Sequence, residues 1–269
     1  MAWAWTARVA IASAVALVLS CAPAAAGMIV LDDPDDPPAV LNGAIFQVFN
    51  VKPAGTGILK PFLRIHDNGT SGNGVEQGYN TGYRGAGFPD FDQKTDPNYT
   101  RNLTLGAVPV ANVGSTSYRE FLLDLNEPGG SKADISLNEL HLFAGAAADG
   151  FSTNFAAPAS FGGFTLLYDL DSNEDNTAIL TDLFSGSGST DVRILIPESS
   201  FVGRSASDYL YFYAEFTQAD GSSQGGFEEF APGQVPEPAS FLIWGMLGVA
   251  FLAWPHARST ISNLGFKRQ

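Results

Sequence analysis

Short apolar segments alternate with clusters of Gly, Asn, Asp and Pro along most of this 269-residue chain. Apolar runs of this kind between turn-forming residues are typical of β-strands. No amphipathic helical pattern stands out between residues 45 and 230. The pattern therefore predicts one all-β domain over 45–230, an antiparallel β-sandwich or jelly-roll-like fold. The predicted strands are 45–51, 58–65, 103–110, 118–125, 135–143, 164–170, 178–184, 191–196 and 209–216.

Two of these segments carry more detailed information. Residues 135–143 alternate in polarity, and keeping one face apolar along the whole segment calls for a β-bulge near Glu139. Residues 209–216 are rich in aromatic side chains at both odd and even positions. This pattern predicts a central strand that is covered on both faces.

Residues 66–102 lack apolar periodicity and are rich in Gly, Asn, Asp and Tyr. We interpret them as a long surface excursion, and such excursions are often functional. Aromatic rings on an exposed loop can stack on sugars, so the aromatic residues of this segment are candidate ligand contacts. Packing of the same rings onto their own sheet is the alternative. The candidates are Tyr79, Tyr83, Phe88, Phe91 and Tyr99.

The first 26 residues have the order of a secretory signal peptide. Arg8 precedes the apolar segment 9–19, and small residues at 24–26 offer a cleavage site. This apolar run is too short to cross a hydrocarbon core of roughly 30 Å. Residues 27–44 follow as an acidic, Pro-rich lead-in. Cys21 in a loose lipoprotein box gives an alternative in which this cysteine is lipidated.

A second signal stands at the C-terminal end. Residues 231–240 form a Pro-rich linker, 241–255 an uncharged apolar helix suited to a membrane, and 256–269 a basic tail that would stay cytoplasmic. Arg258 is the only basic residue near the helix, and the tail is long. The linker contains the motif Val235, Pro236, Glu237, Pro238, Ala239 and Ser240.

This arrangement resembles the PEP-CTERM sorting signal of Gram-negative bacteria, over about 25 residues. The resemblance implies processing near the motif by an exosortase-type enzyme, in addition to signal peptidase at the other end. It implies a precursor anchored in the inner membrane, followed by delivery to the cell surface or an extracellular matrix. Exopolysaccharide is the partner that this location suggests.

The region between the two signals is strongly acidic. Four of the 14 basic residues and one of the 28 acidic residues lie in the terminal signals, which leaves 10 basic against 27 acidic residues and a formal net charge of −17. Such a domain repels nucleic acid and anionic lipid. Divalent cations, basic partners and neutral glycans remain compatible with it.

One acidic segment has the spacing of a cation loop. Ca²⁺ takes six to eight oxygen ligands, and oxygen-bearing side chains at alternate positions can surround it. Glu174 and Leu180 do not fit the later positions of an EF-hand, so the alternatives are an isolated Ca²⁺ loop and a polar hairpin turn. A second acidic segment could share the ion. The candidate calcium ligands are Asp169, Asp171, Asn173 and Asp175, with Asp124 and Asn126.

No residue pattern in the chain identifies a catalytic centre. His66 and His141 lack metal-ligand spacing, and Gly186–Thr190 is a lone glycine turn. The leading hypothesis is a non-enzymatic surface or matrix protein with a structural or adhesive role. The alternative is a carbohydrate-binding module. A hydrolase is a third class, which would require a cleft with two carboxylates, one of them with a raised pKa.

Overall fold

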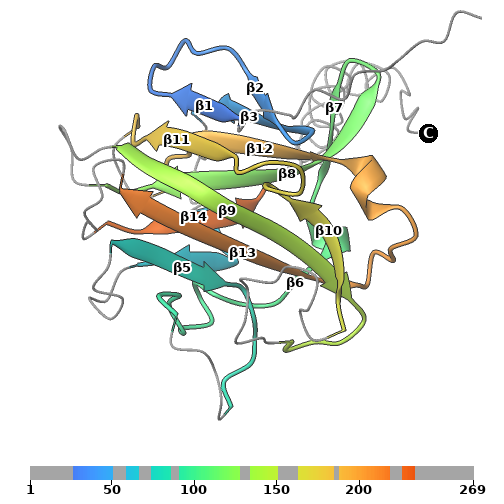
Figure 1. Cartoon of the computed structure of the whole chain (residues 1–269). Coiled ribbons are helices and arrows are strands. Elements are labelled where there is room, and N and C mark those ends of the chain that lie inside the picture. The colour runs from blue at the N-terminus through green and yellow to red at the C-terminus, as the bar shows by residue number, and fades with distance from the viewer. Residues whose placement is uncertain are drawn as a thin grey trace, which may run out of the picture.

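A computed structural model describes residues 27–50, 59–66, 74–85, 91–127, 134–150, 163–184, 188–218 and 226–233. Within these ranges the protein is all-β: its strands form two seven-stranded sheets, joined by short 3₁₀ turns (Figure 1). The predicted fold class is confirmed at this level. The chain passes repeatedly from one sheet to the other, so neighbouring strands within a sheet are often distant in sequence.

Sheet A has the order β1-β11-β9-β13-β5, with β10 added beside β9 and β6 beside β13. Its strands are β1 (Met28–Leu31), β5 (Val75–Tyr79), β6 (Leu103–Thr104), β9 (Asp134–Gly145), β10 (Thr165–Asp169), β11 (Thr177–Thr181) and β13 (Tyr209–Gln218).

Sheet B has the order β2-β3-β12-β8-β14-β4, with β7 added beside β8. Its strands are β2 (Ala39–Leu41), β3 (Ala44–Val48), β4 (Leu63–Ile65), β7 (Val110–Val113), β8 (Thr116–Leu125), β12 (Val192–Pro197) and β14 (Glu228–Pro232). Strand pairing is antiparallel except that β1 runs parallel to β11. Sheet A is therefore mixed, whereas the sequence predicted purely antiparallel pairing.

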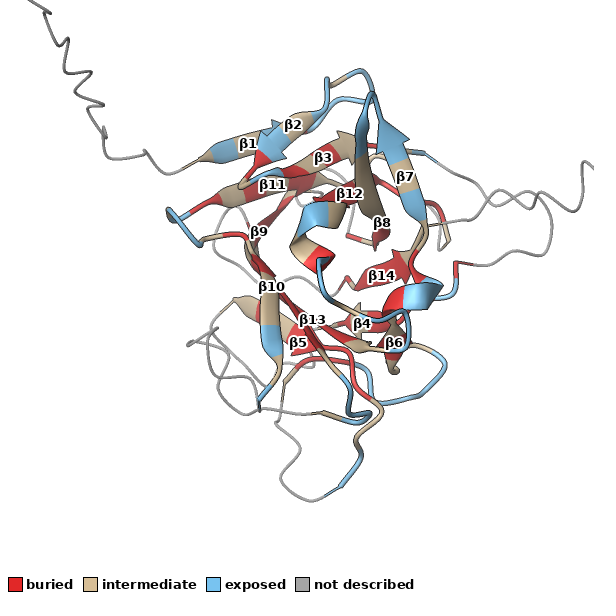
Figure 2. Ribbon diagram, turned by 90° about the vertical axis from the view of Figure 1, so that its right-hand side faces the viewer, coloured by how far each residue is buried: buried red, intermediate tan, exposed pale blue. Residues whose placement is uncertain are grey.

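The main core lies between the two sheets, where buried residues from both layers meet (Figure 2). Phe212 of β13 is fully buried at its centre. Its ring centroid lies 5.5 Å from that of Phe62, 5.2 Å from Phe121 and 4.8 Å from Phe230. The opposite face of β13 belongs to a second, aromatic cluster that contains Tyr211 and Tyr213. The prediction of a central strand covered on both faces is therefore confirmed.

Several predicted strands end where a physical cause is visible. The segment 103–110 is divided into β6, the 3₁₀ turn η1 (Leu105–Ala107) and β7, with Pro109 at the break. The segment 178–184 stops pairing after Thr181. The backbone N–H groups of Leu183 and Phe184 donate instead to the carboxylate of Asp191, at 3.0 and 2.9 Å. The carboxylate of Asp191 thus binds the N–H groups that a neighbouring strand would otherwise bind.

Two segments that we expected to lie outside the sheets contribute strands to them. The lead-in 27–44 contains β1 and β2, and the start of β3. Asn42 and Gly43 both have positive φ, at 42° and 82°, and form the two-residue turn between β2 and β3. The excursion 66–102 contains β5, which pairs with β13.

The signal peptide 1–26, the motif at Val235–Ser240, the apolar helix 241–255 and the tail 256–269 lie outside the described residues. Among the residues that are described, none belongs to a helix with the length and hydropathy to cross a membrane.

Candidate functional site

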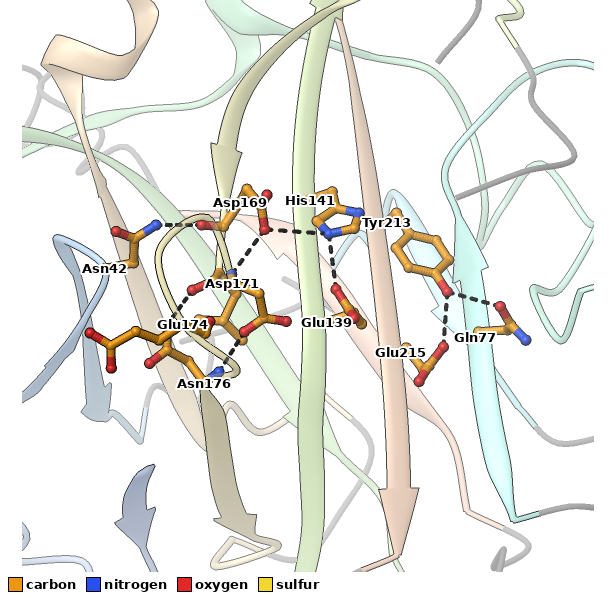
Figure 3. Close-up of polar contacts among 11 residues, drawn as sticks. Asn42, Gln77, Glu139, His141, Asp169, Asp171, Glu174, Asn176, Tyr213 and Glu215 are labelled. Atoms are coloured by element: carbon orange, nitrogen blue, oxygen red, sulfur yellow. Dashed lines mark hydrogen bonds and ion pairs between the residues drawn. The ribbon is translucent and has the colours of Figure 1, made fainter. Parts of the chain in front are cut away.

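The outer face of sheet A carries polar side chains in two adjacent cross-strand rows (Figure 3). In one row, Glu139 of β9 lies beside Glu215 of β13, which lies beside Gln77 of β5. In the other, Asp169 of β10 lies beside His141, which lies beside Tyr213. Paired residues project to the same face of a sheet. We call these six residues, together with Asp171 in the turn after β10, the polar stripe.

A β-bulge produces this alignment. Glu215 pairs with Glu139, but the next residue, Phe216, pairs with Leu137, so Asn138 is the extra residue in β9. The extra residue lets both Leu137 and Leu140 reach the core while Glu139 stays on the outer face. The predicted bulge near Glu139 is confirmed.

Polar contacts within and between strands, together with one pair of stacked rings, connect the stripe. His141 Nε2 lies 2.9 Å from Glu139 Oε2 and 3.5 Å from Asp169 Oδ1. The Tyr213 hydroxyl lies 2.8 Å from Gln77 Oε1 and 3.2 Å from Glu215 Oε2. The His141 and Tyr213 rings stack at 5.5 Å between centroids. His141 is 3% exposed, whereas Glu139 is 37% exposed and reaches solvent.

The carboxyl groups of the stripe differ in their protonation behaviour. The hydrogen bond from His141 lowers the pKa of Glu139. Burial raises the pKa of Glu215, with the nearby Glu139 carboxylate as a further cause. Burial also raises the pKa of Asp171 to about 7, assisted by Glu139 and Asp169. Near neutral pH the stripe therefore combines an ionised acceptor, Glu139, with Asp171, which keeps its proton in part of the molecules.

An aromatic cluster adjoins the stripe on the same face. It contains buried Tyr79, Phe143, Tyr211 and Tyr213, with half-buried Phe91, Phe164, Leu166 and Tyr209 packed against them. Tyr79 was predicted as a ligand contact but is fully buried, with its ring centroid 6.1 Å from that of Phe91. The alternative, packing onto the protein's own sheet, is confirmed for Tyr79.

The other predicted ligand-contacting rings do not form one strip. Phe91 packs against sheet A, at 6.4 Å from Tyr213. Tyr99 lies instead beneath the guanidinium of Arg64 from sheet B, which is 3.8 Å from its ring centroid. Tyr83 is half-buried, and Phe88 lies outside the described residues.

The predicted calcium loop forms a tight turn between β10 and β11. Asp169 Oδ1 accepts the N–H of Asp171 at 2.9 Å, and Asp171 Oδ1 accepts the N–H of Asn176 at 2.6 Å. The side chain of Asn42, from the β2–β3 turn, accepts a hydrogen bond from Asn173 at 3.0 Å. Asp175 is exposed at the tip. These contacts close a polar turn, but it is not the hairpin turn of the alternative, because β10 and β11 both pair with β9 rather than with each other.

Asp124 and Asn126 belong to sheet B and have a different set of neighbours. Asp124 Oδ2 accepts the N–H of Gly188 at 2.8 Å, and burial raises the pKa of Asp124 to about 7. Its nearest acidic groups are Glu229 and Asp182, whereas those of Asp171 are Glu139 and Asp169. The structure thus places the two halves of the predicted shared site in separate clusters.

Sequence reasoning did not identify a third set of acids, at one end of the sandwich. Glu228 is fully buried and contacts the carboxyl groups of Glu76 and Glu127. These three residues come from β5, β14 and the segment after β8.

Across the part of the chain that the structure describes, no three or more His, Cys, Asp or Glu side chains are grouped so that they could hold a metal ion. Comparisons with protein-family models, with curated proteins and with solved structures gave no match for this chain.

Proposed function

We propose that this protein is exported to the cell surface or extracellular matrix, and that it acts there as a non-enzymatic adhesive or structural domain. The proposal combines the two terminal signals with an acidic β-domain of the jelly-roll-like kind between them. In this proposal signal peptidase removes residues 1–26. The helix 241–255 holds the precursor in the inner membrane until an exosortase-type enzyme processes it near Val235–Ser240.

The polar stripe is the observation that carries a binding role. Glu139, at 37% exposed, and half-buried Gln77 and Glu215 offer carboxylate and amide groups in one row on the outer face of the sheet. Sugar hydroxyls donate to such acceptors, and the row spacing of a sheet allows successive hydroxyls to be bound together. The acidic surface disfavours polyanions. A neutral polysaccharide is therefore the ligand class that we assign to this face.

The binding test compares the full chain, purified in a mild detergent, with the Glu139→Gln/Glu215→Gln double variant. The probe is the neutral exopolysaccharide fraction of the host, measured by isothermal titration calorimetry. The Gln carbonyl still accepts a hydrogen bond but carries no charge; hydrogen bonds to charged groups contribute roughly 1.5–3 kcal/mol against roughly 0.5–1.5 for neutral ones, so the two changes together should lower the affinity at least about tenfold. Asp35→Asn is the control, because Asp35 is exposed in the turn between β1 and β2. Equal binding by all three proteins would refute the assignment of the stripe.

The export proposal has its own test. The intact mass of the protein from the host's envelope and medium should show loss of residues 1–26 and of the tail beyond the motif at 235–240. Retention of the tail through Gln269 would instead leave a plain membrane-anchored surface protein.

One observation favours a hydrolase as a second candidate. Glu139 and Glu215 are cross-strand neighbours whose pKa values are displaced in opposite directions. Such a pair could act as base and acid in glycoside hydrolysis. Chromatography of the polysaccharide after incubation distinguishes the two functions: new reducing ends that vanish with Glu215→Gln indicate hydrolysis, and unchanged chain length indicates binding alone.

A further inference from the structure

We propose that Glu76, Glu127 and Glu228 form a proton-sharing lock between the two sheets, which holds one end of the sandwich closed until rising pH removes its protons. We call these three residues the carboxyl lock. This inference is independent of the polar stripe, which lies on the outer face of sheet A.

The carboxyl lock joins the two layers. Glu76 lies on β5 of sheet A, and Glu228 lies on β14 of sheet B. Glu127 lies two residues after the end of β8 in sheet B, and its Oε2 accepts a hydrogen bond at 2.9 Å from Gln218, the last residue of β13 in sheet A. Contacts among these residues therefore cross from one sheet to the other.

Glu228 is at the centre of the lock. Its side chain has no solvent exposure, and neither Oε1 nor Oε2 has a hydrogen-bond donor from another group. Its neighbours are the carboxyl groups of Glu76 and Glu127. Glu228 and its two neighbours cannot all be ionised, because a charge on fully buried Glu228 would face two further carboxylates and would cost several kcal/mol to bury. A proton between two carboxyl groups turns the repulsion into a hydrogen bond.

The surrounding charges do not remove the need for protons. Glu127 is also close to Asp182, whose Oδ2 accepts the Glu127 N–H at 3.1 Å, and to His66. Arg64 lies on the neighbouring strand β4, but it pairs with Glu229. Among the described residues, no ion pair joins a basic side chain to Glu127 or Glu228.

The sign of the pH effect follows from burial. Burial and the adjacent carboxyl groups raise the pKa of Glu228 well above its usual value, and burial raises that of Glu127. The folded state therefore holds protons that the unfolded state releases above about pH 4.3. The stabilisation is complete below that pH and is lost as the pH rises through the folded-state pKa values.

The test is urea unfolding of the full chain in a mild detergent between pH 5 and pH 8.5, compared with Glu228→Gln. Glutamine keeps the shape and neutrality of the protonated acid. For each proton that the lock contributes, the unfolding constant of the wild type should rise up to about tenfold per pH unit more steeply than that of Glu228→Gln. Asp35→Asn, in the exposed β1–β2 turn, should retain the wild-type slope.

Three results would overturn the proposal. One is identical pH slopes for the wild type and Glu228→Gln. Another is stabilisation of the wild type by 1 mM CaCl₂ at pH 8 that Glu228→Gln abolishes, since that would make the cluster a cation site. If Glu228→Gln does not fold, the same comparison is made with Glu127→Gln, and an unchanged slope there counts against the lock as well.

Discussion

Arg119 offers the most direct test of how the two 3₁₀ turns are held against β8. Its Nε and Nη2 donate to the two carboxylate oxygens of Glu198 at 2.6 and 2.8 Å. Its Nη1 donates to the carbonyl oxygens of Leu105 at 3.2 Å and Val108 at 2.7 Å. One side chain of β8 thereby ties down both η1 and η3 (Glu198–Phe201).

The two halves of this network should differ in strength. Glu198 is 38% exposed, so solvent screening limits its pairing to roughly 0.5–1 kcal/mol. The Arg119 side chain is only 16% exposed, and its bonds to the carbonyl groups carry roughly 1.5–3 kcal/mol. We expect Arg119→Met to lower the free energy of unfolding by about 2–4 kcal/mol, and Glu198→Gln by less than about 1 kcal/mol.

Thermal unfolding measures both variants, because about 1 kcal/mol shifts the Tm of a domain of this size by about 2–4 °C. The double variant completes a mutant cycle and isolates the Arg119–Glu198 pairing. An equal loss in the two single variants would mean that the ion pair, rather than the bonds to the carbonyl groups, dominates. A loss below about 1 kcal/mol in Arg119→Met would refute the reasoning altogether.

Three further predictions concern the core, a turn and the stripe. Phe212→Ala should cost about 3–5 kcal/mol in urea unfolding, because it removes the ring at the centre of an aromatic core; a cost under 2 kcal/mol would contradict that placement. Gly43→Ala should cost about 1–2 kcal/mol, because Gly43 has a φ of 82°, and an unchanged Cm would rule out this turn. Asp171→Asn should flatten the decline of stability between pH 4 and pH 7, because the pKa of Asp171 is raised to about 7 and its charged form is disfavoured in the fold; a steeper decline would reverse the sign.

Apolar periodicity predicted the strands that pack both sides of the core. β8, β9, β12 and β13 were all expected from their side chains alone, and all four lie inside a sheet rather than at its edge. Such strands must be apolar because neighbours cover them, so composition and position are physically linked. The alternation along residues 135–143 also indicated a bulge near Glu139, which β9 has.

The strands that were missed are short and take their stability from long-range pairing. β1 precedes an acidic turn and β2 follows it, and three residues of β1 are exposed or only half-buried. The turn residues Asn42 and Gly43 were the available signal for β2, because this dipeptide is typical of a two-residue hairpin. β5 has the sequence VEQGY, with little apolar pattern, and its partner β13 lies more than 130 residues away. β5 is therefore a strand because of its long-range pairing with β13, and its own sequence gives little indication of it.

The polar stripe and the carboxyl lock could not be predicted from the sequence for a related reason: both depend on the register in which the strands pair. With 27 acids between the signals, any acid has many candidate neighbours, and the apolar pattern indicates at best which face it occupies. Glu139 was expected near a bulge, but its partner Glu215 depends on how β13 aligns with β9, and a shift of one residue would put Ala214 or Phe216 beside it.

Glu228 is the stronger case. Its side chain points inward beside Leu125 and Ile65, at a position where the pattern of a buried strand favours an apolar residue. An ionised acid at such a position lowers the stability at neutral pH unless a proton or a cation accompanies it. A comparison of Glu228→Gln with the wild type at pH 8, with and without Ca²⁺, therefore separates a proton-sharing cluster from a cation site.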